Sequence, residues 1–403
     1  MGELYGLPEG WEWTRLEELT EVNLGKTPTR SKKEYFLGDK VWLSIRDLKG
    51  DYVSSSNEGL TDDAIKASNI KIVLKGTLLM SFKLTLGRTA FADCDLYTNE
   101  AIASLPIKND STLDKYFLKY ALGAIDLEKE VDNAVKGKTL NKQKLKNLDI
   151  PLPPLQEQKR IVAKLDSLFA KIDQAITLHQ QNIDEADALM GSALNEVFGE
   201  LDTNKKISLK DITTKIGSGS TPRGGQKAYK TEGISLIRSM NVHDAGFRTK
   251  GLAFIDDEQA KKLNNVTIEE NDVLLNITGA SVARCCIVDK AYLPARVNQH
   301  VSIIRLKEDM LPKFLHYYLI SPSVKADLLF GSSGGATREA ITKSMLESFE
   351  VPFIPIETQQ KTVQYLDQLS QKIETLKQVQ TQKMESLKAL KASILDQAFR
   401  GEI

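Results

Sequence analysis

The chain has 403 residues, which is too many for a single hydrophobic core and predicts two to three domains. Hydrophobic residues make up 41% and charged residues 27% of the chain, as in an ordinary soluble globular protein. Lysine plus arginine equals aspartate plus glutamate at 54 residues each, which excludes a global positive field, so any binding to nucleic acid must depend on local basic surface.

No run of about eighteen apolar residues occurs, so we expect no membrane span and no membrane partner. Residues 1–5 lack the basic region followed by an apolar region that marks a secretory signal. The three cysteines, Cys94, Cys285 and Cys286, lack metal-ligand spacing, and buried reduced thiols are their expected state. These features together predict a cytoplasmic location.

The first part of the chain, residues 1–155, has the pattern of a mixed α/β domain. A turn at 8–11 precedes a short strand or helix start at 13–19, and a basic, turn-rich loop follows at 25–33. We expect a strand over 41–48, short apolar runs of β-type composition over 72–74, 77–82 and 88–92, and a helix over 113–122. A basic segment at 136–144 lies near the end of this domain.

A long helix follows the proline turn Pro151-Leu152-Pro153-Pro154. The prolines stop the preceding structure, because their rings fix φ and remove the backbone donor. Apolar residues then recur at steps of three and four, which predicts one narrow stripe typical of a coiled-coil seam. The stripe consists of Ile161, Leu165, Leu168, Ile172, Ile176, Ile183, Ala186, Met190, Leu194 and Val197.

The second part of the chain repeats the first. Pro352 corresponds to Pro151, Gln359 corresponds to Gln158, and Leu366-Asp367 corresponds to Leu165-Asp166. Chance apolar periodicity would not keep proline, glutamine and aspartate in register, so we infer a tandem duplication. The second helix carries its own stripe, at Val363, Leu366, Leu369, Ile373, Leu376, Met384, Leu387, Ile394 and Ala398.

Within the second domain the framework recurs while the intervening residues diverge. The matched segments are Gly219-Ser220-Thr221-Pro222 with Gly25-Lys26-Thr27-Pro28, Arg284 with Arg88, Asn298-Gln299-His300 with Asn99-Glu100-Ala101, and Lys313-Phe314-Leu315 with Lys115-Tyr116-Phe117. This pattern suggests two equal scaffolds that present different surfaces.

The repeat predicts an α+β protein in which two mixed α/β domains are related by an approximate twofold axis. Such an axis makes the long helices antiparallel, so that their apolar stripes bury each other as a coiled coil. The predicted limits are 1–155 for the first domain, 156–201 for the central helix, 202–355 for the second domain and 356–403 for the C-terminal helix.

No motif for catalysis is apparent. Gly217-Ser218-Gly219 lacks the third glycine of a dinucleotide loop, and Pro222 argues against a helix there. No Asn-Pro-Pro or Asp-Pro-Pro followed by an aromatic residue occurs, so the chain has no self-contained adenine methyltransferase site. The four histidines provide little material for acid–base or metal chemistry. We therefore expect no catalytic, cofactor-binding or metal-binding residue and no enzyme activity in this chain.

Over essentially its full length the chain resembles the specificity (S) subunits of type I restriction–modification systems. The marks of the resemblance are the doubled unit, Leu-Pro-Glu-Gly-Trp at 7–11, Ile-Pro-Leu-Pro-Pro-Leu-Gln-Glu-Gln at 150–158, the Leu-Asp pairs on both helices and Phe-Arg-Gly-Glu-Ile at 399–403. The second proline turn departs slightly, since Thr358-Gln359-Gln360 replaces Glu157-Gln158-Lys159.

The resemblance implies two target recognition domains, each of which reads one half of an interrupted double-stranded DNA site. It also implies a scaffold for two methyltransferase (M) subunits, which carry S-adenosylmethionine, and for restriction (R) subunits, whose work needs ATP and Mg. The reaction served would be adenine methylation or ATP-dependent restriction, with no cofactor in this chain.

Two groups of residues are candidates for these contacts. Cationic and amide side chains suit phosphate and base-edge contacts. The DNA-binding candidates are Lys26, Arg30, Lys32, Lys33, Lys83, Arg88, Lys136, Lys138 and Lys142 in the first domain, and Arg223, Lys227, Arg238, Asn241, Arg284, Arg338 and Lys343 in the second. The candidates for holding M subunits, taken as solvent-facing, are Gln158, Lys159, Arg160, Gln359 and Lys361.

Two other interpretations stay open at this point. The chain could be the recognition subunit of a related type II system built on similar domains. It could also be a coiled-coil scaffold that binds proteins and not DNA, which its zero net charge favours. The target sequence and the length of the gap between the half-sites cannot be read from any short motif.

Overall fold

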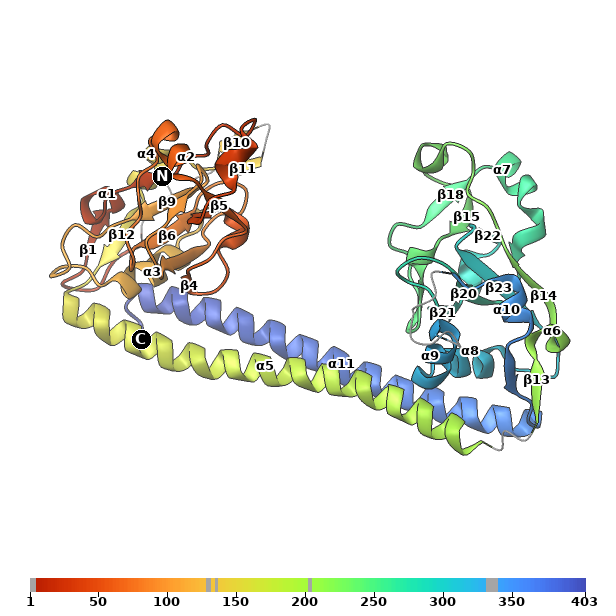
Figure 1. The fold of residues 1–403 in the computed structure, drawn as a ribbon. Coiled ribbons are helices and arrows are strands. Elements are labelled where there is room, and N and C mark those ends of the chain that lie inside the picture. The colour runs from red at the N-terminus through yellow and green to blue at the C-terminus, as the bar shows by residue number, and fades with distance from the viewer. Residues whose placement is uncertain (1–4, 128–131, 135–136, 202–204, 331–339) are drawn as a thin grey trace. The chain divides into compact units, whose positions relative to one another are not determined.

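The computed structural model describes residues 5–127, 132–134, 137–201, 205–330 and 340–403. The chain forms two compact units, Met1–His179 with Gln382–Ile403, and Gln180–Thr381. Each unit contains one mixed domain and one end of each long helix, α5 (Leu155–Glu200) and α11 (Ile356–Phe399), which Figure 1 labels. The predicted limits place each long helix in a segment of its own, whereas the two compact units divide within the long helices, after His179 and after Thr381. The predicted limits therefore stay a prediction.

The first domain is built on a five-stranded and a three-stranded sheet. The larger sheet has the order β2 (Asn23–Leu24), β9 (Ile102–Leu105), β6 (Leu78–Ser81), β7 (Thr89–Ala92) and β4 (Tyr52–Val53). The smaller has the order β5 (Glu58–Leu60), β3 (Lys40–Leu43) and β8 (Tyr97–Thr98). Two further pairs are β1 (Glu12–Arg15) with β12 (Asp149–Leu152), and β10 (Asp132–Ala134) with β11 (Gly137–Thr139). The helical elements are α1 (Leu16–Leu19), α2 (Asp62–Ser68), α3 (Lys115–Ala124), α4 (Lys142–Lys146), η1 (Lys33–Phe36) and η2 (Ile45–Asp47).

The second domain shares most of this topology but has two four-stranded sheets. One sheet has the order β14 (Thr213–Ser218), β23 (Val301–Leu306), β20 (Val273–Asn276) and β21 (Cys285–Ile287). The other has the order β18 (Ala253–Ile255), β15 (Ile234–Ile237), β22 (Ala295–Val297) and β19 (Thr267–Ile268). The remaining pairs are β13 (Lys206–Ser208) with β24 (Glu350–Pro352), and β16 (Val242–His243) with β17 (Gly246–Phe247). The helical elements are α6 (Leu209–Ile212), α7 (Asp257–Lys262), α8 (Pro312–Ile320), α9 (Pro322–Phe330), α10 (Lys343–Glu347), η4 (Gly225–Ala228), η5 (Ser239–Asn241), η6 (Asn264–Val266) and η7 (Lys290–Tyr292).

Equivalent strands pair in the same way in both domains, which supports the duplication. β3 pairs in parallel with β8 in the first domain, and β15 pairs in parallel with β22 in the second. The strand order β2-β9-β6-β7 corresponds to β14-β23-β20-β21. The predicted α+β class and repeated domain are therefore confirmed.

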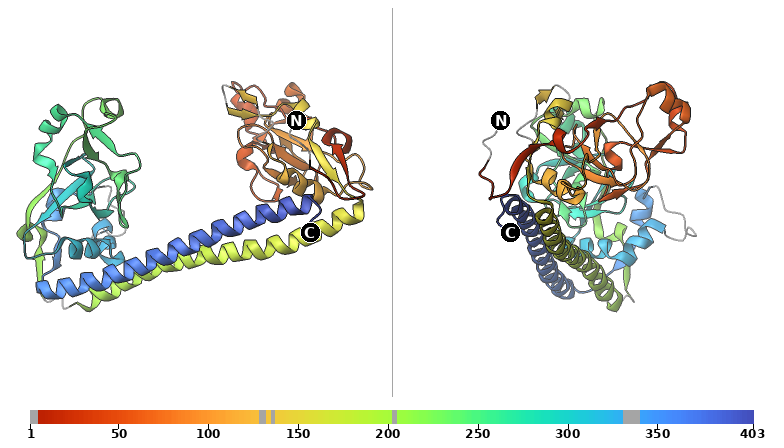
Figure 2. Two further views of the ribbon diagram at one scale, coloured as in Figure 1. Left: turned by 180° about the vertical axis from the view of Figure 1, so that it is seen from behind. Right: turned by 90° about the vertical axis from the view of Figure 1, so that its left-hand side faces the viewer.

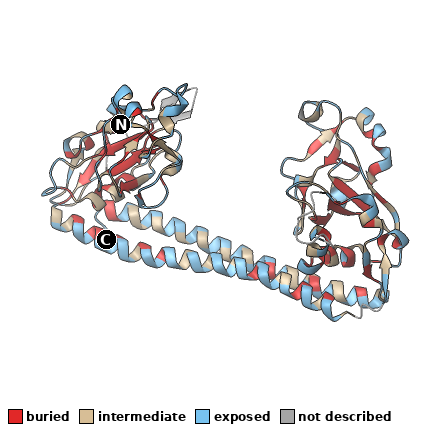
Figure 3. Ribbon diagram, in the orientation of Figure 1, coloured by how far each residue is buried: buried red, intermediate tan, exposed pale blue. Residues whose placement is uncertain are grey.

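The ends of the long helices complete the cores of the domains. In the first unit, Ile161 and Leu165 of α5 and Phe399 of α11 are buried in one cluster with Phe117 of α3. In the second unit, Leu194 and Phe198 of α5 and Leu366 of α11 are buried with Phe314 of α8. Figure 3 shows the burial concentrated on the strands, with long exposed stretches on the helices. The apolar stripes of the long helices therefore pack against the domains as well as against each other.

Within each unit α5 and α11 lie side by side and antiparallel (Figure 2). In the first unit Lys391 Nζ lies 2.7 Å from a carboxylate oxygen of Asp173. In the second unit Lys377 Nζ lies 2.7 Å from Asp187 Oδ1. The predicted stripe is wrong at Leu376, which is 42% exposed, because a two-helix pair covers only one side of each helix.

One matched segment of the repeat is displaced by one residue from its predicted register. Tyr120 donates to Asp166 Oδ1 at 2.5 Å, and Tyr317 donates to Asp367 Oδ1 at 2.8 Å. These contacts align Phe314 with Phe117, which pack in equivalent places, rather than with Tyr116. Burial first, and then the aspartate partner, raises the pKa of both tyrosines above the ordinary value, so both stay protonated donors.

Candidate nucleic-acid interface

A glycine begins the same loop in both domains, because no side chain fits at that position. A Cβ on Gly25 would lie 2.2 Å from the carbonyl oxygen of Thr98, and one on Gly219 would lie 1.8 Å from that of Val297. In the first domain the loop is also held by Trp42, whose Nε1 donates to Lys26 O at 3.1 Å. The loop framework is thus fixed by backbone contacts, which leaves the following side chains free to differ.

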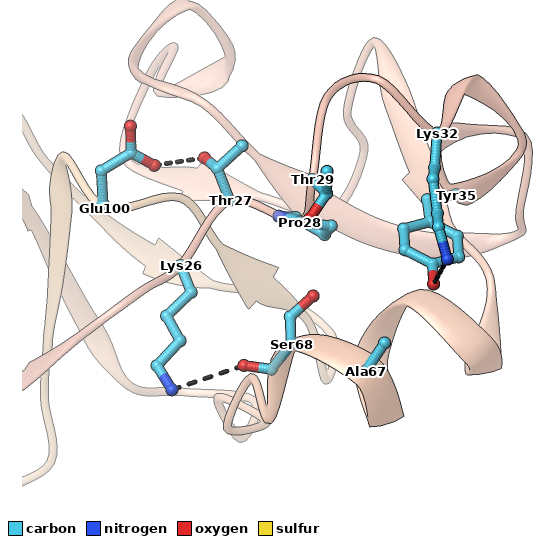
Figure 4. A pocket seen from close by; sticks show the side chains of 9 residues that line it. All are labelled: Lys26, Thr27, Pro28, Thr29, Lys32, Tyr35, Ala67, Ser68 and Glu100. Carbon is cyan, nitrogen blue, oxygen red and sulfur yellow. Dashed lines mark hydrogen bonds between the residues drawn. The ribbon is translucent and has the colours of Figure 1, made fainter.

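Four of the predicted DNA-binding residues lie on this loop in the first domain, and all are exposed: Lys26, Arg30, Lys32 and Lys33. Figure 4 shows Lys26 and Lys32 on the wall of a cavity of about 610 Å³. Lys26 Nζ donates to the carbonyl oxygens of Ser68 and Asn69, at the end of α2. The loop therefore presents a local basic surface on a chain whose net charge is zero.

Arg30 is held more firmly than a typical surface arginine. Its Nη1 lies 2.7 and 2.9 Å from the two carboxylate oxygens of Glu58. Its guanidinium also lies 4.2 Å from the ring centroid of Phe36 and 5.0 Å from that of Trp42. A guanidinium oriented in this way loses less rotamer freedom on binding, although a DNA contact would compete with Glu58.

In the second domain the candidates divide into exposed and structural residues. Arg223 and Lys227 are exposed on the equivalent loop. Asn241, in contrast, is fully buried: its Oδ1 accepts the N–H of Arg238, and its Nδ2 donates to the carbonyl of Arg248. The expectation that Asn241 reads a base is therefore corrected, because its amide already holds a turn. The Arg238 guanidinium lies 5.1 Å from the ring centroid of Tyr229, and this arginine is half-buried.

The matched arginines follow equivalent turns. Gly87 and Ala283, which precede Arg88 and Arg284, have φ values of 74° and 65° and donate to the strand across the turn. Arg88 is exposed, whereas Arg284 is half-buried. Such equivalence suits a phosphate or structural role that both domains need. Lys83, in the turn before Arg88, lies with its Nζ 5.5 Å from the ring centroid of Phe82.

Two further candidates begin equivalent short helices. Lys142 is the first residue of α4, and Lys343 is the first residue of α10. Both are exposed, and Lys343 Nζ lies 3.5 Å from Glu347. Lys136 and Arg338 lie outside the described residues, and of Lys138 only the backbone, in β11, is described. The roles of all these cations in DNA binding stay predictions.

The expectation that Gln158 and Gln359 face solvent is wrong. Both side chains are fully buried at the starts of α5 and α11. Gln158 Oε1 accepts the N–H of Asp114 at 2.8 Å, and its Nε2 donates to the carbonyls of Thr112 and Pro153, each at 2.8 Å. An amide is needed because this position must accept one hydrogen bond and donate two.

Gln359 makes the same three contacts in the second unit. Its Oε1 accepts the N–H of Leu311 at 2.8 Å, and its Nε2 donates to the carbonyls of Asp309 at 3.0 Å and Ile354 at 2.9 Å. The two glutamines therefore join each long helix to the helix of its own domain, α3 or α8, and are not available to a partner.

The other predicted partner-binding residues, Lys159, Arg160 and Lys361, are exposed on the helices. Arg160 forms two hydrogen bonds with Glu157, at 2.6 and 2.7 Å, and one with the carbonyl of Ile403. The Glu157 contact raises the pKa of Arg160, and the reciprocal hydrogen bond lowers the pKa of Glu157. Arg160 thus already takes part in joining α5 to the end of the chain.

The cavity is also lined by residues without positive charge, which a criterion of positive charge does not indicate. They are Thr27, Pro28, Thr29, Tyr35, Ala67, Ser68 and Glu100. The recurrence of Asn99-Glu100-Ala101 as Asn298-Gln299-His300 is the sequence feature that indicates Glu100 and its counterpart Gln299. Among the described residues, no three histidine, cysteine or acidic side chains gather as a metal site would require. No described helix combines the length and apolar character needed to cross a bilayer.

One protein-family model covers most of the chain. The model of the type I restriction modification DNA specificity domain matches twice, over residues 8–185 and 202–384. Each match contains one mixed domain and most of the long helix that follows it.

The chain is also similar to curated specificity subunits. It is 26% identical over 335 residues to the specificity subunit of the type I restriction enzyme EcoBI from Escherichia coli, which covers 76% of this chain and 69% of that subunit. It is 22% identical over 431 residues to the EcoKI specificity subunit of Escherichia coli strain K12, which covers 98% of this chain and 90% of that subunit.

Two solved structures share the fold. A chain from a study of complex assembly and conformational transition in the type I R-M system has a TM-score of 0.74 and 23% identity, covering 99% of this chain and 100% of that one. The HsdS subunit from Thermoanaerobacter tengcongensis has a TM-score of 0.52 and 23% identity, covering 99% of each chain. With the family model matched in both halves, the chain belongs to the type I restriction–modification DNA specificity family.

Proposed function

We propose that this chain is the sequence-reading subunit of a type I restriction–modification complex, in which each domain reads one half of an interrupted duplex site. The observation that carries the proposal is the double match of the DNA specificity domain, once per domain. The duplicated loops at Gly25 and Gly219 add support, since an identical framework carries Lys26 and Arg30 in one domain and Arg223 in the other. Two domains that share one loop backbone but present different side chains are suited to recognising two different half-sites.

Linking the domains strengthens binding. Once one domain holds its half-site, the other searches at a high effective concentration, so two modest readers together achieve useful affinity. Each mismatched base pair would cost about 1–3 kcal/mol, and mismatches in separate halves would add. If both domains engage the same face of the duplex, the half-site centres lie about 34–36 Å apart, which is one helical turn.

The chain acts without catalytic chemistry of its own. Two M subunits, with S-adenosylmethionine, would methylate an adenine on each strand, and R subunits with ATP and Mg would restrict unmodified DNA. The exposed parts of α5 and α11, which include Lys159 and Lys361, are the surfaces offered to the M subunits. The cytoplasm is the compartment in which such a complex would meet DNA.

The test is duplex binding by this chain in complex with its M subunits. Methylome sequencing of the host first identifies the site, and each half is then randomised separately. Randomising either half should weaken binding by orders of magnitude while the other half continues to be recognised. Sequence-independent binding, or binding to protein but not to DNA, would support the scaffold interpretation instead.

Salt dependence separates the roles of the predicted cations. A lysine that contacts phosphate releases counterions, so Lys26→Gln or Lys142→Gln should weaken binding to all sequences and reduce the logarithmic salt slope by about 1. A base-reading residue should instead change the preference at one position. Replacement of Lys66, an exposed lysine on α2 that is not a candidate, by glutamine serves as the control.

A further inference from the structure

One turn recurs in both domains but carries a different functional group in each. In the first domain Asn99 Oδ1 accepts the N–H of Ala101 at 3.1 Å. In the second, Asn298 Oδ1 accepts the N–H of His300, also at 3.1 Å. The middle residue of the first turn is Glu100 and that of the second is Gln299, and both are exposed. A carboxylate and an amide therefore occupy equivalent places on the two domains.

A threonine from the neighbouring loop orients each of these side chains. Thr27 Oγ1 donates to Glu100 Oε2, and Thr221 Oγ1 donates to Gln299 Oε1. Each threonine lies two residues after the glycine that fixes the loop, so the pair is part of the shared framework. A side chain held in this way loses less conformational entropy when it makes a further contact. Glu100 Oε1 is the carboxylate oxygen that Thr27 does not contact. Gln299 Nε2 lies 3.0 Å from His300 Nε2, so its amide offers a base the second N–H and the second lone pair of Oε1.

The surroundings of Glu100 argue against a general phosphate role. Glu100 lines the cavity of about 610 Å³ together with Lys26 and Lys32, and it is the one acidic residue among the described residues of that wall (Figure 4). An exposed carboxylate on a DNA-binding surface is repelled by phosphates, so it weakens binding unless it makes a specific contact. A carboxylate only accepts hydrogen bonds, and in the major groove it finds donors in the amines of cytosine and adenine.

We propose that Glu100 and Gln299 are equivalent base-reading residues, each of which contacts a base edge in the half-site read by its own domain. Glu100 accepts a hydrogen bond from a base amine, N4 of cytosine or N6 of adenine. Gln299 both accepts and donates, which suits the N6 and N7 atoms of adenine. The exchange of carboxylate for amide contributes to the difference between the two half-sites. This inference depends on the proposed function, reading of one half-site by each domain.

Reciprocal substitutions in the complex with M subunits test the proposal. Glu100→Gln gives the first domain the residue of the second, and Gln299→Glu does the reverse. Either head group accepts the threonine hydroxyl, as the sister domain demonstrates, so the loop framework should be retained. Glu12→Gln, at an exposed position of β1, makes the same change of charge elsewhere in the first domain and is the matched control.

The readout is selection from duplex libraries in which one half-site at a time is randomised. In Glu100→Gln, one base position of the first half-site should change its preference by about tenfold or more, in favour of adenine, and the second half-site should not change. In Gln299→Glu, the change should fall in the second half-site only. The control should select the same sequences as the unmodified complex.

Different outcomes overturn the inference and the proposed function. If Glu100→Gln strengthens binding to every duplex equally and Gln299→Glu weakens it equally, these residues act only as surface charges, and the inference fails. Loss of folding in both variants, measured by thermal unfolding, would show that they hold the loop, which also refutes base reading. If the unmodified complex shows no half-site preference at all, the proposed function itself fails.

Discussion

Replacement of the buried glutamine of either unit by methionine should destabilise that unit locally. Gln158→Met keeps the length and burial of the side chain but removes its three hydrogen bonds, to Asp114, Thr112 and Pro153. The bond to Pro153 is buried and the other two are part-buried. Each such backbone group left without a partner costs about 1–3 kcal/mol, so the total should be about 3 kcal/mol or more. Gln359→Met should have an equal effect in the second unit, because its three contacts are the same.

Hydrogen exchange measures this effect at a single group. The amide of Asp114 donates to Gln158 and that of Leu311 donates to Gln359. A loss of about 3 kcal/mol corresponds to a fall in protection of roughly a hundredfold or more if local opening limits exchange. We expect faster exchange at Asp114 in Gln158→Met and at Leu311 in Gln359→Met, with each variant leaving the other amide unchanged.

Exposed neighbours provide the controls. Gln156→Met and Gln360→Met make the same chemical change on the same helices at exposed positions, and should leave both amides protected. If Gln158→Met exchanges as slowly as Gln156→Met, the glutamine does not join helix to domain and this reasoning is wrong. Weaker binding of M subunits at unchanged stability would restore the original expectation that Gln158 contacts a partner.

Other variants test the loop, a buried histidine and the helix pair. Gly25→Ala places a Cβ 2.2 Å from Thr98 O, so it should cost about 1–3 kcal/mol in denaturant unfolding and weaken duplex binding. Burial lowers the pKa of His316, so the unfolded chain binds the proton first, and stability present above about pH 6.5 should be lost below it, by at most about 1.4 kcal/mol per pH unit. His316→Gln should flatten this dependence in thermal unfolding between pH 5 and 7. Asp187→Asn should cost less than about 1 kcal/mol, because the Asp187 side chain is 61% exposed and water screens its ion pair with the partly buried Lys377.

Each of these predictions has an outcome that would contradict it. Gly6→Ala, at a glycine where an added Cβ would meet no atom within 4 Å, should leave stability unchanged, and equal stability of Gly25→Ala would mean that the loop can move. An unchanged acid dependence in His316→Gln would place the titrating group elsewhere. A cost above about 2 kcal/mol for Asp187→Asn would mean that the pair is far better shielded from water than its exposure indicates.

The long helices and the duplication could be predicted because they depend on periodic and repeated residues. The stripe at Ile161 and Leu165 appears in sequence as a 3.6-residue period, and no tertiary contact is needed to detect it. Leu376 has the same spacing and is nonetheless exposed, since periodicity reveals a face but not the extent of what covers it. The register near Phe117 and Phe314 is displaced by one residue, because Lys115 is followed by two aromatic residues and Lys313 by one. Phe314 can therefore be aligned with either Tyr116 or Phe117.

The candidate site was less predictable, because the roles of polar residues depend on tertiary geometry. Gln158 is a hydrophilic residue in the first turn of a helix, and nothing local reveals that backbone groups around Asp114 converge on it. Asn241 carries an amide of the kind that reads bases, yet that amide accepts the N–H of Arg238 within a short turn. The negative charge of Glu100 does not indicate DNA binding in a sequence, and its equivalence with Gln299 becomes evident only when the two turns are compared.

The central claim, that each domain reads its own half-site, is tested most directly by exchanging one domain. Residues 1–150 would be replaced by the corresponding segment of another family member that recognises a different site, and the methylome of the host would be sequenced. We predict that one half of the methylated site changes to that of the donor while the other half is retained. A change in both halves, or in neither, would contradict the account.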